Sequence, residues 1–376
     1  MHALDENLNP LTPPDASTAK KIRDILSASG YLSCDYFKSA GKTGVPEDDK
    51  RGALLNGKTG GLAPGTIFEA LFYAGETLNR EPVKQALRPM EITEWVRLGL
   101  LREENDRVRA NVQLLAYRDL VIAHDFKEHG LSRNHVIGIT PATDALARLT
   151  IRRHSGDTLD LGAGSGVQAL LAASHSDKVI ATDINKRAVN IADFNAELNG
   201  CRNVENIAGN LFEPVAGKTF DLIVSCPPFV ISPDSQYYYL DSGSTGDSML
   251  ERIVRESAGH LNEGGYCQLM SEVVQYSGQT WPRRLFGWLD GLGCDAWMLH
   301  RATMSPEEYA RVWVMDRSES PEDLMREWLA YYREQNIEAI TSGLLTIRKR
   351  SNAANWYRID QLPAGIGDCG ASIDQG

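Results

Sequence analysis

A short strand that runs into a glycine-rich turn constrains the fold of this chain more than any other feature. The strand-like segment 158–161 leads into Gly162, Gly164 and Gly166, and a second apolar segment ends on Asp183 about twenty residues later. Glycine tolerates positive φ angles, so a ligand can approach the backbone of the turn and the start of the next helix. A carboxylate ending the second strand can accept hydrogen bonds from two ribose hydroxyls. The pattern predicts a nucleotide-binding βαβ unit; the alternative is a turn that only packs a helix on a sheet.

The spacing of the glycines separates two kinds of nucleotide ligand. Dinucleotide sites place the third glycine three residues after the second, whereas Gly166 follows Gly164 by two. Asp160 stands immediately before the turn, and its charge would repel a pyrophosphate. A ligand that carries a cationic amino group suits this turn better. The sequence therefore favours S-adenosylmethionine.

A second motif follows the strand-like segment 220–225 and reads Cys226-Pro227-Pro228-Phe229. Together the two motifs resemble those of the class I S-adenosylmethionine-dependent methyltransferases, over roughly residues 135–350. The nearest group is the one that methylates the nitrogen of planar groups, including the glutamine N5 enzymes and small-domain RNA enzymes, which carry Asn, Asp or Ser before Pro-Pro. The resemblance implies an α/β fold with a doubly wound, seven-stranded, mostly parallel Rossmann-like sheet.

Cys226 departs from the pattern of that group. In the related enzymes the first residue of the tetrapeptide accepts a hydrogen bond from the target amine, and a cysteine thiol is a weak acceptor. One interpretation is that Cys226 only packs, as buried thiols usually do. A nucleophilic role would require a lowered pKa.

The resemblance also implies further contacts with the cofactor. Asn210 would bind the adenine amino group beside the backbone of Leu211, or else form a plain turn. Thr140 would lie over the methionine end, or else only cap the helix that begins there. The residues expected to bind the cofactor are Thr140, Asp160, Gly162, Ala163, Gly164, Gly166, Asp183, Ile184, Asn210, Leu211 and Cys226.

Three consecutive tyrosines follow the tetrapeptide. Side chains alternate along a strand, so the three rings cannot all face one core. An aromatic face can hold a sulfonium or a substrate cation, and structural packing is the alternative. The residues expected at the reaction centre are Cys226, Pro227, Pro228, Phe229, Tyr237, Tyr238 and Tyr239.

The chain of 376 residues is long enough for one large and one small domain. Residues 1–130 are expected to form a helical or winged-helix-like domain, which serves either as a cap or substrate domain or as a DNA- or peptide-recognition module. The first use is favoured, because the candidate recognition helix carries two glutamates, Glu91 and Glu94, beside Arg97.

The catalytic domain is expected over 135–350, with a helical insertion at 305–340. Surface aromatics of the insertion can cover a substrate pocket or a second subunit of a homodimer. Residues 351–376 are expected to form a flexible tail, because they are rich in glycine.

Composition excludes several classes of function. A net charge of −11 without a basic block disfavours a large phosphate-contacting surface, and with it rRNA, tRNA or DNA as substrate. Six scattered cysteines support neither a zinc site nor a disulfide framework, so no metal is expected. No apolar run has the length of a membrane span, and the first residues do not resemble a signal peptide, so a cytoplasmic protein is expected.

Three functions are compatible with these features. The first is methyl transfer from S-adenosylmethionine to a small molecule or a peptide side chain, with the enzyme acting chiefly by orientation. The second uses the same cofactor for aminopropyl transfer or intramolecular cyclisation and releases methylthioadenosine. The third is a non-catalytic protein that senses the cofactor and binds a partner.

Overall fold

The computed structural model describes residues 10–33, 63–126, 133–233, 246–314, 320–352, 354–363, 365 and 367–375. The chain divides into two compact units. The first comprises 1–139, 164–170 and 185–206, and the second comprises 140–163, 171–184 and 207–376.

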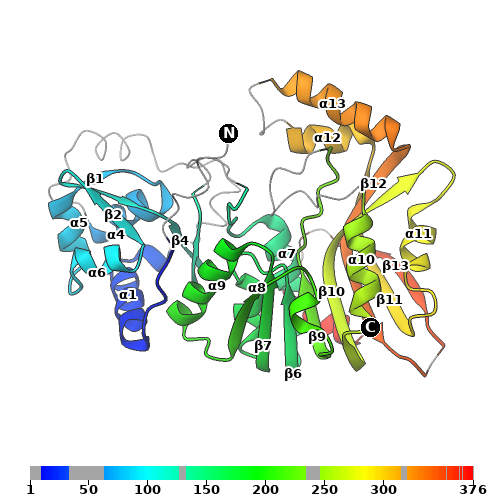
Figure 1. Ribbon diagram of the computed structural model, residues 1–376, viewed down its shortest axis with the longest axis horizontal. Helices are drawn as coiled ribbons and strands as arrows, with labels where there is room; N and C mark the ends of the chain where they lie inside the picture. Colours follow the sequence, from blue (N-terminus) through cyan, green and yellow to red (C-terminus); the bar gives the residue numbers. More distant parts are fainter. Residues whose placement is uncertain are drawn as a thin grey trace. The chain divides into compact units, whose positions relative to one another are not determined.

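The first unit contains short helices and a small antiparallel sheet (Figure 1). The rings of Phe68, Phe72 and Trp95 pack against one another in its core. The candidate recognition helix ends at Arg97, because Gly99 adopts a φ of 79° and turns the chain into a strand. The elements are α1 (Ala16–Ala28), α4 (Pro64–Phe68), the π-helix η2 (Glu69–Tyr73), β1 (Leu78–Asn79), α5 (Arg80–Ala86), α6 (Ile92–Arg97), β2 (Leu101–Glu104) and β3 (Arg107–Ala110), with the sheet order β1-β3-β2.

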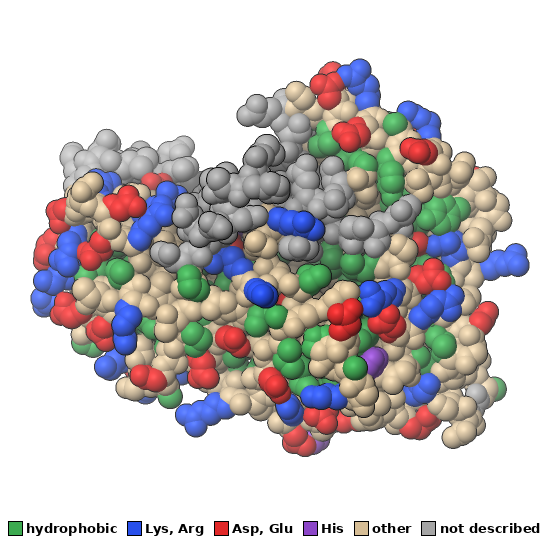
Figure 2. All heavy atoms as spheres, viewed as in Figure 1, with side chains coloured by type: hydrophobic (Ala, Val, Ile, Leu, Met, Phe, Trp, Pro, Cys, Tyr) green, Lys and Arg blue, Asp and Glu red, His purple; other side chains and the backbone are tan. Residues whose placement is uncertain are grey.

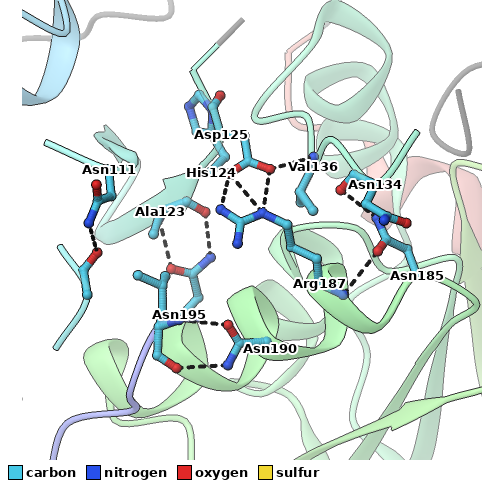
Figure 3. A network of polar contacts seen from close by, with 12 residues as sticks. Asn111, Ala123, His124, Asp125, Asn134, Val136, Asn185, Arg187, Asn190 and Asn195 are labelled. Carbon is cyan, nitrogen blue, oxygen red and sulfur yellow. Dashed lines mark hydrogen bonds and ion pairs between the residues drawn. The ribbon is translucent and has the colours of Figure 1, made fainter. Parts of the chain in front are cut away.

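A hairpin of β4 (Gln113–Tyr117) and β5 (Leu120–His124) lies against helix α9 (Lys186–Asn199) in the same unit. The amide side chain of Asn195 accepts from the N–H of Ala123 at 2.8 Å and donates to its carbonyl oxygen at 3.0 Å (Figure 3). Asn199 does the same with Val121, at 2.9 and 2.8 Å. Two asparagines one helical turn apart therefore pair with the outer edge of β5, as a further strand would.

The second unit is built on one large sheet with the strand order β13-β11-β12-β10-β9-β6-β7-β8. Neighbouring strands from β10 to β7 run parallel, whereas β12 is antiparallel to both β10 and β11. This confirms the predicted doubly wound, mostly parallel α/β fold. The strands are β6 (Ser155–Leu161), β7 (Ser176–Asp183), β8 (Val204–Ala208), β9 (Phe220–Ser225), β10 (Leu261–Tyr276), β11 (Cys294–Met304), β12 (Ile337–Lys349) and β13 (Tyr357–Gln361).

Both faces of the central strands are buried. Along β9, Ile223 contacts one apolar cluster, whereas its neighbours Leu222 and Val224 contact another. Side chains of successive strand residues point to opposite faces, so this alternation places a core on each side of the sheet. The helices of this unit are α7 (Pro141–Leu149), α10 (Ser248–Ser257), α11 (Trp281–Gly287), α12 (Pro306–Val314), α13 (Pro321–Glu334) and α14 (Gly370–Gln375); α8 (Val167–Ala172) crosses into the first unit.

The number of strands differs from the prediction of seven, because the segment expected to be a flexible tail supplies an eighth. Strand β13 pairs in parallel with β11, and its Asp360 accepts a hydrogen bond from Trp297 Nε1 at 2.8 Å. The ring of Tyr357 stacks on Phe286 with 4.9 Å between centroids. Tyr357 and Ile359 alternate with the charged residues Arg358 and Asp360. This period of two favours a strand over the coil suggested by the glycines that follow.

The helical pair expected within 305–340 is present as α12 and α13, which lie side by side (Figure 1). Between them and the start of β12 is a third apolar cluster, which contains the fully buried rings of Trp328, Tyr309 and Tyr332. Most aromatics of this segment are therefore part of the core.

Candidate functional site

The glycine-rich turn begins where β6 ends. The N–H groups of Gly162 and Ala163 both donate to the carbonyl oxygen of Thr182 on β7, at 2.8 and 3.0 Å. The φ angles of Gly162, Gly164 and Gly166 are 74°, 55° and 82°. These left-handed conformations strain any residue with a Cβ atom, which explains why the turn requires glycine.

The glycines have two different surroundings. A Cβ atom added to Gly162 or Gly164 would meet no atom within 4 Å, whereas one on Gly166 would lie 3.1 Å from Cβ of Ala192 in α9. Gly166 therefore permits close helix packing. The first two glycines leave open space beside the backbone, which is where a ligand would need it.

The acidic end of β7 lies beside the segment that follows β8. The N–H of Gly209 donates to the carbonyl oxygen of Asp183 at 2.9 Å, and the hydroxyl of Thr182 donates to the carbonyl oxygen of Leu211 at 3.2 Å. Leu211 itself has a φ of 49°. A strained non-glycine residue of this kind is held in place by its surroundings and is typical of functional sites.

Asn210 and Ile184 contribute one polar and one apolar group to this edge. The side-chain amide of Asn210 donates to Glu213 at 3.2 Å, so a turn contact does exist at this residue. Ile184 is 52% exposed although it is aliphatic. Its exposure leaves an apolar surface next to the carboxylate of Asp183.

Asp160 and Cys226 lie close together at the carboxyl ends of β6 and β9. The side chain of Asp160 is buried, and Ser225 links the two strands by donating to the carbonyl oxygen of Leu161 at 2.7 Å. Burial, and then the nearby charge of Asp160, raise the pKa of the Cys226 thiol to about 12. The thiol is therefore protonated at neutral pH, which argues against the nucleophilic role.

The chain after the tetrapeptide is held by tyrosines of the helical pair. The hydroxyl of Tyr309 accepts from the N–H of Ile231 at 3.2 Å, and Tyr332 donates to the carbonyl oxygen of the same residue at 2.7 Å. Tyr309 in turn donates to the buried carboxyl of Glu272 on β10. The ring of Phe229 meets Trp313 of α12 edge to face.

Within the tetrapeptide, Pro227 is buried and Pro228 is partly exposed. Thr140 caps α7, because its hydroxyl accepts from the N–H of Thr143 at 3.1 Å; a cofactor contact at Thr140 stays a prediction. Tyr237, Tyr238 and Tyr239 lie outside the described residues.

The sequence interpretation missed the residues that support the site. Glu272 had one detectable signal, since it is an acid in a mostly apolar stretch near the end of a long strand. Tyr309 and Tyr332 had no comparable signal, because their hydroxyl partners lie 78 and 101 residues away.

The surface carries mixed charge. On the face drawn in Figure 2, Lys and Arg side chains of the described residues are interspersed with Asp and Glu. Within that described part of the chain, no group of three or more His, Cys, Asp or Glu side chains could hold a metal ion. None of the helices described is both long and apolar enough to cross a membrane.

Comparison with known proteins matches the methyltransferase small domain family to residues 137–280. A protein of Methanocaldococcus jannaschii assigned as a protein N5-glutamine methyltransferase is 31% identical over 149 residues, which is 37% of this chain and 75% of that protein. The release factor glutamine methyltransferase of Geobacter sulfurreducens is 34% identical over 35% of this chain and 50% of its own length. The ribosomal RNA small subunit methyltransferase C of Cronobacter sakazakii is 32% identical over 36% of this chain and 37% of its own length.

The match covers three quarters of the first of these relatives but only about half and a third of the other two. The family match to residues 137–280 contains both motifs, the glycine turn and the tetrapeptide, together with the strands that place them. The chain therefore belongs to the methyltransferase small domain family and is a class I methyltransferase.

Proposed function

We propose that the chain transfers a methyl group from S-adenosylmethionine to a small molecule or a peptide side chain. The observation that carries the proposal is the buried carboxylate of Asp160 beside a protonated thiol, at the end of the strand that opens the glycine turn. A buried negative charge attracts a cation and repels phosphate. S-adenosylmethionine has two cationic groups at its methionine end, a sulfonium and an ammonium.

The remaining predicted contacts fit the rest of that cofactor. Asp183 would accept from the ribose hydroxyls, and the exposed apolar side chain of Ile184 would lie against the adenine. Asn210 and the backbone of Leu211 would bind the adenine edge, while the open backbone at Gly162, Ala163 and Gly164 would accept the methionine portion. When bound, the cofactor supplies an electrophilic methyl group and leaves as S-adenosylhomocysteine, so the protein needs mainly to orient the acceptor.

The acceptor would lie beside the tetrapeptide. The Cys226 side chain cannot replace the carbonyl oxygen of an Asn there, so backbone carbonyl groups of the tetrapeptide would have to bind an acceptor amine. The relatives are named for glutamine or ribosomal RNA methylation. The net charge of −11 and the mixed surface charge favour an acceptor without a long phosphate backbone.

The same cysteine keeps a second function open, in which the cofactor's own aminopropyl portion is transferred or cyclised. Cys226 lacks the side-chain oxygen that would accept a hydrogen bond from a target amine, and this absence favours the second function. Incubation of purified protein with S-adenosylmethionine, with and without cell extract, separates the two by mass spectrometry of the nucleoside product. Extract-dependent S-adenosylhomocysteine supports methyl transfer, whereas methylthioadenosine formed by the protein alone overturns it. Cofactor binding without either product would favour the sensing function.

Labelled methyl groups would identify the acceptor class. Label in small molecules or protein supports the proposal, and label in RNA would overturn the proposed acceptor.

The ribose assignment has a matched control within one strand. Asp183→Ala should weaken cofactor binding by about tenfold or more, as expected for losing charge-assisted hydrogen bonds. Asp177→Ala changes the same residue type near the other end of β7, where Asp177 contacts exposed His154, and should leave binding unchanged. Isothermal titration with S-adenosylhomocysteine measures both; unchanged affinity in Asp183→Ala would sink the ribose assignment.

A further inference from the structure

Asn195 lies at a junction that the proposed chemistry does not use. Its side chain is fully buried in α9. Besides its two hydrogen bonds with Ala123, it donates to the carbonyl oxygen of Ser165 at 2.9 Å. Ser165 stands between Gly164 and Gly166 in the glycine turn and is itself buried.

The amide of Asn195 is fully engaged by these contacts. Its two N–H hydrogens go to the carbonyl oxygens of Ala123 and Ser165, and its oxygen accepts from the N–H of Ala123. A primary amide has no further hydrogen to donate. The position of the turn and the position of the hairpin edge are therefore fixed by one rigid planar group.

A second contact holds the turn on the same face of the helix. Ala192 precedes Asn195 by three residues, so the two side chains are neighbours on α9. A Cβ atom on Gly166 would lie 3.1 Å from Cβ of Ala192, which shows how closely the turn approaches the helix. The turn therefore packs against α9 through Gly166 and Ala192, and it is hydrogen-bonded to α9 through Ser165 and Asn195.

We infer that Asn195 is a positioning residue for the cofactor, and that it links the glycine turn to the edge of the β4–β5 hairpin. The inference rests on the proposed function. The turn has three glycines in left-handed conformations. Without support from the rest of the fold, these glycines would also populate other backbone conformations. Holding the Ser165 carbonyl of the turn fixes the left-handed conformations before the cofactor arrives and lowers the entropy lost on binding.

Asn199 provides a control with the same edge contacts and no contact with the turn. It makes the same two hydrogen bonds with β5, to Val121, and its remaining donor goes to the carbonyl oxygen of Asn195. Both asparagines thus accept one hydrogen bond and donate two. The residues differ in that only Asn195 contacts Ser165.

The test compares Asn195→Ala and Asn199→Ala in the full chain, by isothermal titration with S-adenosylhomocysteine and by thermal unfolding. Both variants should unfold at lower temperature. The dissociation constant should rise about five- to tenfold for Asn195→Ala, the size expected for one lost buried hydrogen bond, and less than about twofold for Asn199→Ala. Equal effects on affinity in the two variants, or none in Asn195→Ala, would overturn the inference.

Hydrogen exchange on the wild-type chain gives a readout that does not depend on a variant folding. Linkage is reciprocal. A cofactor that orders the turn should therefore also order the edge of β5 at Ala123, which Asn195 contacts. S-adenosylhomocysteine should slow exchange of the Ala123 N–H more than that of the Val121 N–H. Equal protection at both amides contradicts the link. Failure of the wild type to bind the nucleoside would overturn both this inference and the proposed function. Binding by the wild type, with equal losses of affinity in Asn195→Ala and Asn199→Ala, would overturn the inference alone.

Discussion

Replacing Glu272 by glutamine should remove a pH dependence of stability that the wild-type chain carries. Burial raises the pKa of the Glu272 carboxyl from 4.5 to about 8, against the opposing effects of the Tyr309 hydrogen bond and the positive charge of Arg301. The folded protein therefore holds this proton more tightly than the unfolded chain. The contribution of the protonated Glu272 to the free energy of unfolding is fully present below the unfolded pKa of 4.5. This contribution is lost as the pH rises toward 8.

The size of the effect follows from the two pKa values. Between about pH 5.5 and pH 8 the unfolded carboxyl is almost fully ionised, whereas the folded one reaches half ionisation only at the upper limit. Linkage then predicts that the free energy of unfolding falls by about 3 kcal/mol over this interval. Glutamine has a similar shape and cannot titrate, so Glu272→Gln should lack this loss.

Urea-induced unfolding, followed by tryptophan fluorescence at both pH values, measures the effect. Trp313 lies in the same helix as Tyr309, and Trp328 lies in the neighbouring α13, so both report on this part of the fold. All other titrating groups are common to the two chains and cancel in the comparison. If the wild type and Glu272→Gln lose stability in parallel, Glu272 is ionised in the folded protein and the reasoning is wrong.

Two further tests concern a buried ion pair of the first unit and the thiol of Cys226. Arg187 and Asp125 form a bidentate ion pair with side chains 10% and 4% exposed (Figure 3), so Arg187→Met should lower the free energy of unfolding by about 3–5 kcal/mol. Adding Asp125→Leu should recover much of that loss in urea unfolding, and a further additive loss would show that the charges are not coupled. Because burial raises the pKa of Cys226 to about 12, Cys226→Ser should keep product formation within about threefold. A loss beyond a hundredfold, by mass spectrometry of the nucleoside, would restore the nucleophilic role.

The fold and the conformation of the glycine turn were predictable because their signals are local. The glycine turn and Asp183 belong to one strand–turn–helix–strand segment, where spacing alone fixes which backbone groups meet. The structure confirms the mostly parallel sheet for the same reason. The eighth strand was not predictable from composition, because the glycines after 361 obscured the alternation of Tyr357 and Ile359 with charged residues.

The supporting residues were not predictable because their contacts are long-range. The hydrogen-bond partners of Asn195 depend on how a hairpin 72 residues earlier in the chain packs against its helix. Tyr309 and Glu272 meet only once the helical pair is folded onto β10. Packing decides such contacts, and no local pattern encodes them.

The asparagine-capped edge of β5 also has a consequence for how the chain is made. During synthesis from the N-terminus, the hairpin leaves the ribosome before α9, whose Asn195 and Asn199 follow their β5 partners by 72 and 78 residues. At translation rates of about 5–20 residues per second the outer edge of β5 stays unpaired for roughly four to fifteen seconds. An open strand edge is a template for pairing with other chains. Aggregation of nascent chains should therefore be most sensitive to conditions that slow translation between the hairpin and α9.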